Sequence, residues 1–311
     1  MLFYLASLLD PHFRSIALTP DNVPIAMMLF AVLFFTWYGL KQGVENDRYL
    51  AKGEDFPLKA EAQKKVFVWP DLVYIELMCI VVMTVFLIVW SIGLKAPLEA
   101  PANPAMSPNP SKAPWYFLGL QEMLVYFDPW YAGVLLPGLI IVGLAAIPYI
   151  DVNPKGSGYY TFKERKFAII AFLFGFLVLW VSLIVLGTFL RGPNWNFFGP
   201  FEKWDVHKVV PLLNVNLSEI IWVKLFRISL PQNWLVREFF GLILAAAYLL
   251  VPPLWLTKRY LKDLFEKMGP ARYGVLMFLV MMMASLPIKM LLRWAFNLKY
   301  IVSIPEFFFN I

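Results

Sequence analysis

Residues 72–94 read LVYIELMCIVVMTVFLIVWSIGL and contain one charged side chain, Glu76. About 20 predominantly apolar residues are enough for an α-helix to cross the roughly 30 Å hydrocarbon core of a membrane. This stretch has that length and that composition. We therefore predict a transmembrane helix at 72–94.

Other stretches of the chain repeat this pattern. Four further runs of spanning length are Val23–Leu40, Trp130–Ile150, Lys166–Leu190 and Leu235–Leu256. A sixth run, Tyr273–Trp294, contains Pro287, and we predict a span that is kinked or ends early. The shorter run Trp115–Phe127 cannot span. The sequence thus predicts an all-α, polytopic bundle of about six spans, with a short re-entrant or interfacial helix on the outer face.

The composition of the 311 residues agrees with a membrane protein. Hydrophobic residues make up 60% and charged residues 15%, and the mean hydropathy is +0.65. Soluble domains are about half apolar and about a quarter charged. An aromatic content of 17% suits belts at the two membrane interfaces. We predict an integral membrane protein in contact with lipid.

Cysteine and histidine limit the cofactors that the chain can hold. The single Cys79 excludes disulfide frameworks and thiolate metal sites, and no Cys-x-x-Cys-His motif for c-type haem occurs. The two histidines, His12 and His207, lie outside the predicted spans. We predict no metal site. The net charge of +6 is spread over loops, so it indicates membrane topology rather than nucleic-acid binding.

The distribution of cations predicts the orientation of the spans. The compact loops 41–65, 155–166 and 258–272 hold 15 of the 27 lysines and arginines. The positive-inside rule places these loops in the cytoplasm and both termini on the outer side. Lys289, Arg293 and Lys299, near the end of the sixth run, are interpreted as anchors that reach toward the membrane surface. Residues 191–234, rich in Trp, Phe, Gly and Pro, suit a docking surface on the outer face.

The segment between the second and third spans is the most informative. Residues 97–129 read PLEAPANPAMSPNPSKAPWYFLGLQEMLVYFDP. The prolines enforce an extended path before an aromatic helix that carries Gln121 and Glu122. Irregular backbone at membrane depth is tolerated where it is buried in protein or lines a cavity. We predict a pocket-forming loop on the outer face, with Asp128 in a turn before Pro129.

Four motifs in this region carry a resemblance to a known family. They are WPDLVY at 69–74, PANP at 101–104, PWYF at 114–117 and IPYID at 147–151. Their order around the spans resembles the C-terminal half of cytochrome b, in the separate subunit IV form of cytochrome bc-type quinol oxidoreductases. The resemblance covers residues 69–190. It implies that the loop and its short helix form a quinol-oxidation pocket beside a Rieske-type iron–sulfur protein.

The pocket signature departs from the family at one position. The family has Pro-Glu-Trp-Tyr, whose glutamate accepts a proton from quinol, whereas this chain has Ala113-Pro114-Trp115-Tyr116. Glu122 is our candidate for the missing base, with a structural ion pair to a lysine as the alternative. Tyr116 is the candidate hydrogen-bond donor to quinol or an interfacial anchor. The remaining candidate quinol contacts are Pro114, Trp115, Phe117, Leu120 and Tyr126.

Two acidic residues at the start of the second span suggest a proton pathway. Asp71 and Glu76 could deliver protons toward a quinone site on the cytoplasmic face. The alternative is structural: Asp71 favours the positive end of the helix dipole, and Glu76 makes an interhelical hydrogen bond.

The resemblance also implies cofactors and partners. Because two histidines outside the spans cannot ligate two haems, haem b belongs to a partner cytochrome subunit. Quinol and a Rieske-type iron–sulfur or c-type cytochrome subunit complete the expected electron-transfer complex, in a bacterial-type cytoplasmic membrane. Domain boundaries are expected at 1–68, 69–190 and 191–311. The alternatives are a structural anchor without its own quinone site and, with less support, a transporter with a re-entrant loop.

Overall fold

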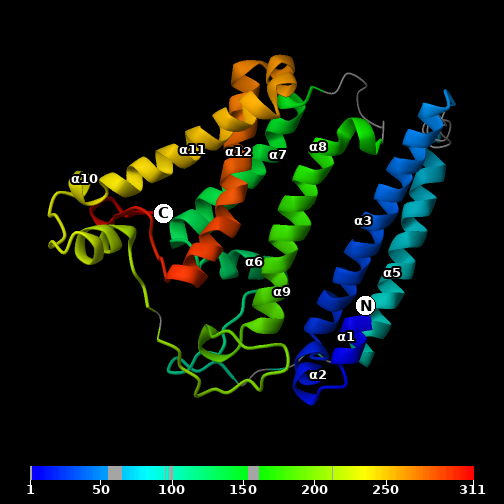
Figure 1. Ribbon diagram of the computed structural model, residues 1–311. Coiled ribbons are helices and arrows are strands. Elements are labelled where there is room, and N and C mark those ends of the chain that lie inside the picture. Colours follow the sequence, from blue (N-terminus) through cyan, green and yellow to red (C-terminus); the bar gives the residue numbers. More distant parts are fainter. Residues whose placement is uncertain are drawn as a thin grey trace. The chain divides into compact units, whose positions relative to one another are not determined.

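The computed structural model describes residues 2–54, 65–94, 101–152, 161–211 and 213–311, together with Ala96 and Leu98. These residues are mostly helical, and their strands are the short antiparallel pair β1 (Ser303–Ile304) and β2 (Phe309–Asn310) (Figure 1). The chain divides into two compact units. The first comprises Met1–Ser111, Lys155–Ile170 and Thr188–His207, and the second comprises Lys112–Pro154, Ala171–Gly187 and Lys208–Ile311.

Six helices in the described residues are long and apolar enough to cross a membrane. Three of them are single helices: α3 (Asn22–Ala51), α11 (Phe239–Arg259) and α12 (Lys262–Phe296). Two combine a π-helical turn with an α-helix: Val68–Gly93 consists of η1 (Val68–Leu72) and α5 (Val73–Gly93), and Tyr131–Ile150 consists of η2 (Tyr131–Leu135) and α7 (Leu136–Ile150). The sixth, Phe162–Leu190, contains α8 (Phe162–Leu173), η3 (Phe174–Val181), α9 (Ser182–Val185) and η4 (Leu186–Leu190). The predicted all-α, multi-pass bundle of about six spans is confirmed.

The fifth span begins later than the sequence predicts. Its predicted first residues form a separate turn, α10 (Trp234–Arg237), and α11 follows from Phe239. Asn233 starts this turn, because its side-chain oxygen accepts a hydrogen bond of 2.9 Å from Leu235 N–H.

The sixth span continues through Pro287 instead of ending there. Proline removes one backbone hydrogen bond, and membrane helices tolerate this loss where neighbouring groups satisfy the freed carbonyls. The interruption of α12 lies earlier, at Gly269, whose φ of +74° only glycine adopts readily. From Pro270 to Phe296 the backbone dihedral angles are helical.

The first unit begins with two short helices, α1 (Leu2–Ser7) and α2 (Pro11–Ala17). The Asp10 carboxylate starts α2 by accepting hydrogen bonds from the backbone N–H groups of His12 and Phe13. Phe13 is buried, with its ring centroid 5.6 Å from that of Tyr4 and 6.2 Å from that of Phe201. These contacts join the N-terminal helices to the segment that follows the fourth span.

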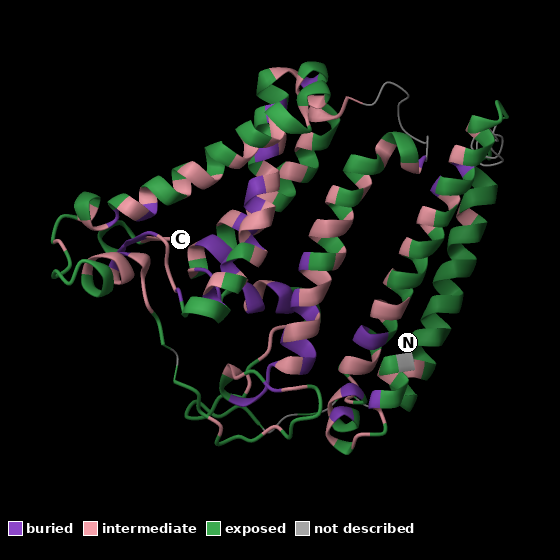
Figure 2. Cartoon of the chain, in the orientation of Figure 1, coloured by how far each residue is buried: buried purple, intermediate pink, exposed green. Residues whose placement is uncertain are grey.

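Helix α5 has no buried residue along its whole length (Figure 2). Its apolar side chains therefore face outward in every direction within this chain. A helix of this composition requires lipid or another protein chain around it.

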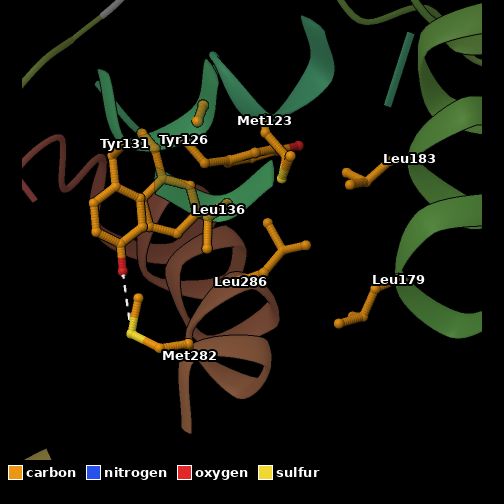
Figure 3. Close-up of a cluster of buried hydrophobic side chains, with 10 residues drawn as sticks. Met123, Tyr126, Tyr131, Leu136, Leu179, Leu183, Met282 and Leu286 are labelled. Carbon is orange, nitrogen blue, oxygen red and sulfur yellow. Dashed lines mark hydrogen bonds between the residues drawn. The ribbon is translucent and has the colours of Figure 1, made fainter. Parts of the chain in front are cut away.

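The second unit has a core between α6 (Trp115–Met123), α7, the 171–187 segment and α12. Figure 3 shows the buried side chains that form it. Its members are Met123, Tyr126, Phe127, Tyr131, Ala132, Leu136, Leu179, Leu183, Met282 and Leu286. Phe127 stacks on Tyr131 with ring centroids 4.7 Å apart, and the Tyr131 hydroxyl donates to the Met282 sulfur at 3.7 Å. This core fixes the C-terminal end of α6 against α12.

A polar clamp holds the C-terminal segment against the start of α11. Glu238 is 1% exposed and accepts hydrogen bonds from Arg237 Nε at 3.2 Å and from the Ser303 N–H at 3.0 Å. Arg237 also contacts the Glu306 carboxylate at 2.9 Å. Two of these contacts, Ser303 with Glu238 and Arg237 with Glu306, connect residues that are far apart in the sequence.

Candidate functional site

The short helix α6 forms the centre of the candidate site. Pro114 precedes it in an extended conformation, with φ −50° and ψ 148°, and its carbonyl accepts the first hydrogen bond, from Phe117 N–H at 2.8 Å. The helix ends after Met123, where the chain turns toward Asp128 and the third span. The predicted short helix after the prolines is therefore present, and it does not span.

The two faces of α6 differ sharply in exposure. Leu118, Gly119, Glu122 and Met123 are buried, whereas Trp115, Tyr116 and Phe117 are 40%, 49% and 50% exposed. The rings of the three exposed residues contact one another in sequence order, with centroids 5.7 Å and 4.7 Å apart. The exposed side is thus an aromatic surface and the buried side carries a carboxyl group.

Close packing holds the buried face of α6 against the fourth span. A Cβ atom at Gly119 would lie 3.5 Å from the ring of Trp180, and one at Gly187 would lie 3.4 Å from the carbonyl oxygen of Leu118. The absence of side chains at these two glycines lets the two backbones approach. The buried face therefore has little freedom to move.

Glu122 is completely buried, with 0% of its surface exposed. The hydroxyl of Tyr126, itself 1% exposed, donates a hydrogen bond of 3.0 Å to Glu122 Oε1. The two residues are four positions apart, so the turn that ends α6 brings them together. A buried carboxyl group is costly unless such partners satisfy it.

Lys112 adds a positive charge near Glu122. Burial lowers the pKa of the Lys112 ammonium to about 8, and the negative charge of Glu122 partly offsets this effect. The loop reaches this position because Ala113 N–H donates a hydrogen bond of 2.8 Å to Gln121 Oε1. Sequence reasoning did not identify Lys112, because only the folded loop brings it back to the helix.

Some of the predicted site residues contact one another in the structure, and others lie apart from them. Glu122 and Tyr126 are in contact in the interior, and Leu120 packs against the core beside them. Pro114 and Tyr116 lie exposed at the start of α6, away from the buried carboxyl group. Tyr116 is therefore on the exposed side of α6 and Glu122 on its buried side.

Asp71 and Glu76 belong to the first unit, at the start of the second span. Asp71 lies in η1 and Glu76 in the first turn of α5, and both are exposed. Their exposure leaves the two carboxyl groups open to lipid, water or a partner chain.

The proline loop is tied to the aromatic segment that follows the fourth span. Asn109 and Asn194 exchange two hydrogen bonds, one of 2.9 Å between their amide groups and one of 2.6 Å from Asn194 N–H to Asn109 Oδ1. Asn194 has a φ of 56°, a conformation that asparagine tolerates better than most residues. The loop and the aromatic segment therefore form one surface of the first unit.

Neither histidine lies in a helix long enough to span. His12 is in α2, and His207 is in a turn where its backbone N–H donates to Asp205 Oδ1 at 2.9 Å. Within the described ranges, no group of three or more His, Cys, Asp or Glu side chains is arranged to hold a metal ion.

Asp128 and the end of α12 form a second polar cluster. Asp128 lies between the turn that follows α6 and the start of the third span, and its Oδ2 accepts hydrogen bonds from the Tyr300 hydroxyl at 3.2 Å and from Asn310 Nδ2 at 3.1 Å. Lys289 and Arg293 are 1% and 7% exposed. The interpretation of these two side chains as surface anchors is wrong, because both point into the protein.

Comparison with known proteins identifies the family that this region resembles. Residues 101–197 match the model of the family described as cytochrome b (C-terminal)/b6/petD. The match includes the proline loop, α6 and the third and fourth spans. It leaves out the WPDLVY motif, with which the predicted resemblance began, and extends past its predicted end at 190. No solved structure matches the chain. The family match supports the expected resemblance and implies a membrane subunit of a cytochrome bc-type complex.

Proposed function

From the match of residues 101–197 to the cytochrome b C-terminal family, we propose that this chain forms part of the outer quinol-oxidation pocket of a cytochrome bc-type complex. One observation carries the proposal. Glu122, a fully buried carboxyl group, lies in the short helix that begins at Trp115 of the Ala113-Pro114-Trp115-Tyr116 segment. Ionisable groups buried in apolar surroundings are rare and mark functional sites.

Glu122 is the proton acceptor in this proposal. Oxidation of a quinol releases two protons with its two electrons, so a base in the pocket favours the reaction. Pro114 occupies the position of the family's glutamate and has no titratable side chain. Glu122 supplies a carboxyl group about two helical turns further along, and the Tyr126 hydroxyl orients it.

The exposed aromatic face of α6 is the proposed quinol surface. Trp115 and Phe117 offer apolar rings to the quinol ring, and the Tyr116 hydroxyl hydrogen-bonds a quinol oxygen. Pro114 borders this surface. Leu120 and Tyr126 support it from the interior.

Lys112 is the group that connects this surface with Glu122. It is half-buried, and its charge interacts with that of Glu122. A pKa of about 8 allows the Lys112 amine to gain and lose a proton near neutral pH. Lys112 can therefore pass a proton from the open face toward the buried carboxylate.

The rest of the complex supplies the redox centres. A partner cytochrome subunit provides the haem b ligands, and a Rieske-type iron–sulfur or c-type cytochrome subunit receives the other electron. Helix α5, which has no buried residue, offers a helix surface for such a partner. Asp71 and Glu76 are the proposed proton-delivery residues on the cytoplasmic side. The complex lies in a bacterial-type cytoplasmic membrane, with both termini of this chain outside and proton release to that side.

One observation favours a second function, that of a structural anchor without a quinone site. Pro114 replaces the carboxyl group that the family uses in catalysis. If Glu122 only stabilises the fold, the chain still holds the complex together while quinol binds elsewhere. The two functions differ in what the Glu122→Gln substitution does to turnover.

The test begins with the intact assembly, purified in mild detergent through a tag on this chain. We expect a quinol-minus-oxidised difference spectrum with b-type haem bands, and an inhibitor of the outer pocket that blocks haem reduction. Glu122→Gln should slow quinol turnover at least tenfold. The matched control is Glu266→Gln, since this side chain is 62% exposed and pairs with Lys262 on the surface of α12.

Two results would change the conclusion. Quinol-reducible haem with normal turnover in Glu122→Gln would favour the structural anchor. An assembly without quinol-reducible haem would overturn both functions.

A further inference from the structure

A buried ammonium group in α12 lacks a polar partner. Lys289 is 1% exposed, and its Nζ has no hydrogen-bond partner among the described residues. The nearest ring contacts are with Phe127 and Tyr300, whose centroids lie 5.8 Å and 6.0 Å from Nζ. Contacts at this distance are weak compensation for the loss of water around a full charge.

The charges that act on Lys289 are also positive. They belong to Arg293, one turn further along α12, and to Lys299 beyond the helix end. Like charges that share a buried region repel one another. Lys289, Arg293 and Lys299 therefore form a cation cluster with a local excess of positive charge.

Neutral oxygens, rather than carboxylates, satisfy Arg293. Its guanidinium donates to the carbonyls of Leu213 at 3.1 Å and Asn297 at 3.0 Å, and to Asn214 Oδ1 at 2.6 Å. These bonds fix the side chain but leave its charge uncompensated. Such fixed guanidinium groups suit anion binding, because ordering them costs little when the ligand arrives.

The charge of Asp128 acts on Lys299 in this cluster, and both carboxylate oxygens of Asp128 already accept hydrogen bonds. Oδ2 accepts from Tyr300 and Asn310, and Oδ1 accepts from Trp130 N–H at 3.3 Å. Burial and the charge of Arg293 lower the pKa of Lys299, and Asp128 only partly offsets them. Asp128 therefore offsets the positive charge only at Lys299.

We propose that the cation cluster binds a phosphate group. Lys289 forms the floor of the site, and the half-buried Lys299 and Tyr300 form its opening. A phosphate presents several acceptor oxygens at once, which matches ammonium donors that approach from different sides. Lys289 lies seven residues before the end of α12, about 10 Å below the helix end. The phosphodiester of an anionic lipid headgroup and inorganic phosphate share this chemistry.

The experiment measures binding to the purified assembly and does not depend on quinol turnover. Inorganic phosphate is titrated in equilibrium dialysis. In parallel, the assembly is placed in nanodiscs of phosphatidylcholine alone or with phosphatidylglycerol, and retained lipid is counted by native mass spectrometry. We expect one saturable site, with binding weakened at least tenfold in Lys289→Met. Lys262→Met is the matched control, because Lys262 lies on the same helix with a 75% exposed side chain.

The two probes separate the two sources. Retention of phosphatidylglycerol without binding of free phosphate identifies a lipid site, and the reverse identifies a phosphate-ion site. If Lys289→Met does not fold, Lys299→Met tests the same site from its opening and should also weaken binding. Absence of saturable binding of either probe, or equal binding by Lys289→Met and Lys262→Met, would overturn the proposal.

Discussion

The Tyr126 hydroxyl donates a hydrogen bond of 3.0 Å to Oε1 of Glu122, and both side chains are almost completely buried. The bond joins the predicted proton acceptor to the core that α6 shares with α12. Any loss of this donor leaves a buried carboxyl group with one partner fewer. The contact therefore affects both the stability of the fold and the position of the proposed base.

Tyr126→Phe removes this donor while it keeps the ring in the core. We expect the free energy of unfolding to fall by about 1–3 kcal/mol, the usual cost of a missing partner for a buried polar group. Thermal unfolding of the purified assembly measures the change. Tyr116→Phe is the matched control, because the Tyr116 side chain is 49% exposed. Equal loss of stability in the two variants would contradict a structural role for the Tyr126 hydroxyl.

Lys112 should titrate near pH 8 in the folded chain, because burial lowers its pKa from 10.5 to about 8. Glu122 partly raises this pKa, so Glu122→Gln should lower it further. The rate of Lys112 acylation as a function of pH, followed by mass spectrometry, measures the midpoint. A midpoint that does not move in Glu122→Gln would contradict the interaction between the two side chains.

The lowered pKa of Lys112 also predicts how the free energy of unfolding depends on pH. Between about pH 8 and pH 10.5 Lys112 holds more protons in the unfolded chain than in the folded one. Its contribution to the free energy of unfolding therefore rises with pH across this window. Below pH 8 the penalty for burying the ammonium is fully present. Lys112→Met should remove this pH dependence from the unfolding midpoint, and an unchanged dependence would contradict the shifted pKa.

The spans were predictable because backbone groups in a membrane must be satisfied within a helix, so run length alone indicates them. Of the two outcomes predicted at Pro287, a kink or an early end, the early end was wrong, since a proline that would end a soluble helix is tolerated in α12. The sequence at Gly269 did not indicate a helix interruption, although α12 is interrupted at this residue. Local sequence therefore predicted which segments are helical better than where each helix begins and ends.

The candidate site was predictable only in part. Glu122 was identifiable as an ionisable group in an apolar segment. The interaction of Lys112 with Glu122 was not, because it depends on the hydrogen bond from Ala113 to Gln121. Lys289 carried the same signal as Glu122, a charge within an apolar run, but its place near the end of a span suggested a surface anchor. The burial of Lys289 depends on the packing of Tyr300 and Phe127 around it, which the local sequence does not reveal.

Gly241 should not tolerate a side chain. A Cβ atom there would clash with the carbonyl oxygen of Ile301 and lie 3.1 Å from Cγ2 of Val302. Gly241→Ala should therefore push the C-terminal segment away from α11, at a cost of about 1–3 kcal/mol. Gly274→Ala is the control, because a Cβ atom at Gly274 in α12 meets nothing within 4 Å. The unfolding temperatures of the two variants test this, and a Gly241→Ala variant as stable as the control would contradict the close approach.

Arg237→Met should destabilise the attachment of the C-terminal segment more than Glu306→Gln does. Both substitutions remove the ion pair between Arg237 and Glu306, but only Arg237→Met removes the cation beside Glu238, which is 1% exposed. Breaking a buried ion pair from one side costs about 3–5 kcal/mol, because the remaining charge stays desolvated. Ser303 N–H still donates to Glu238, which places the expected loss at the lower end of this range. Glu306 is on the surface, so its substitution should have little effect. Hydrogen exchange at residues 301–311 measures the attachment directly, and protection that is equal in the two variants would show that Glu238 does not depend on Arg237.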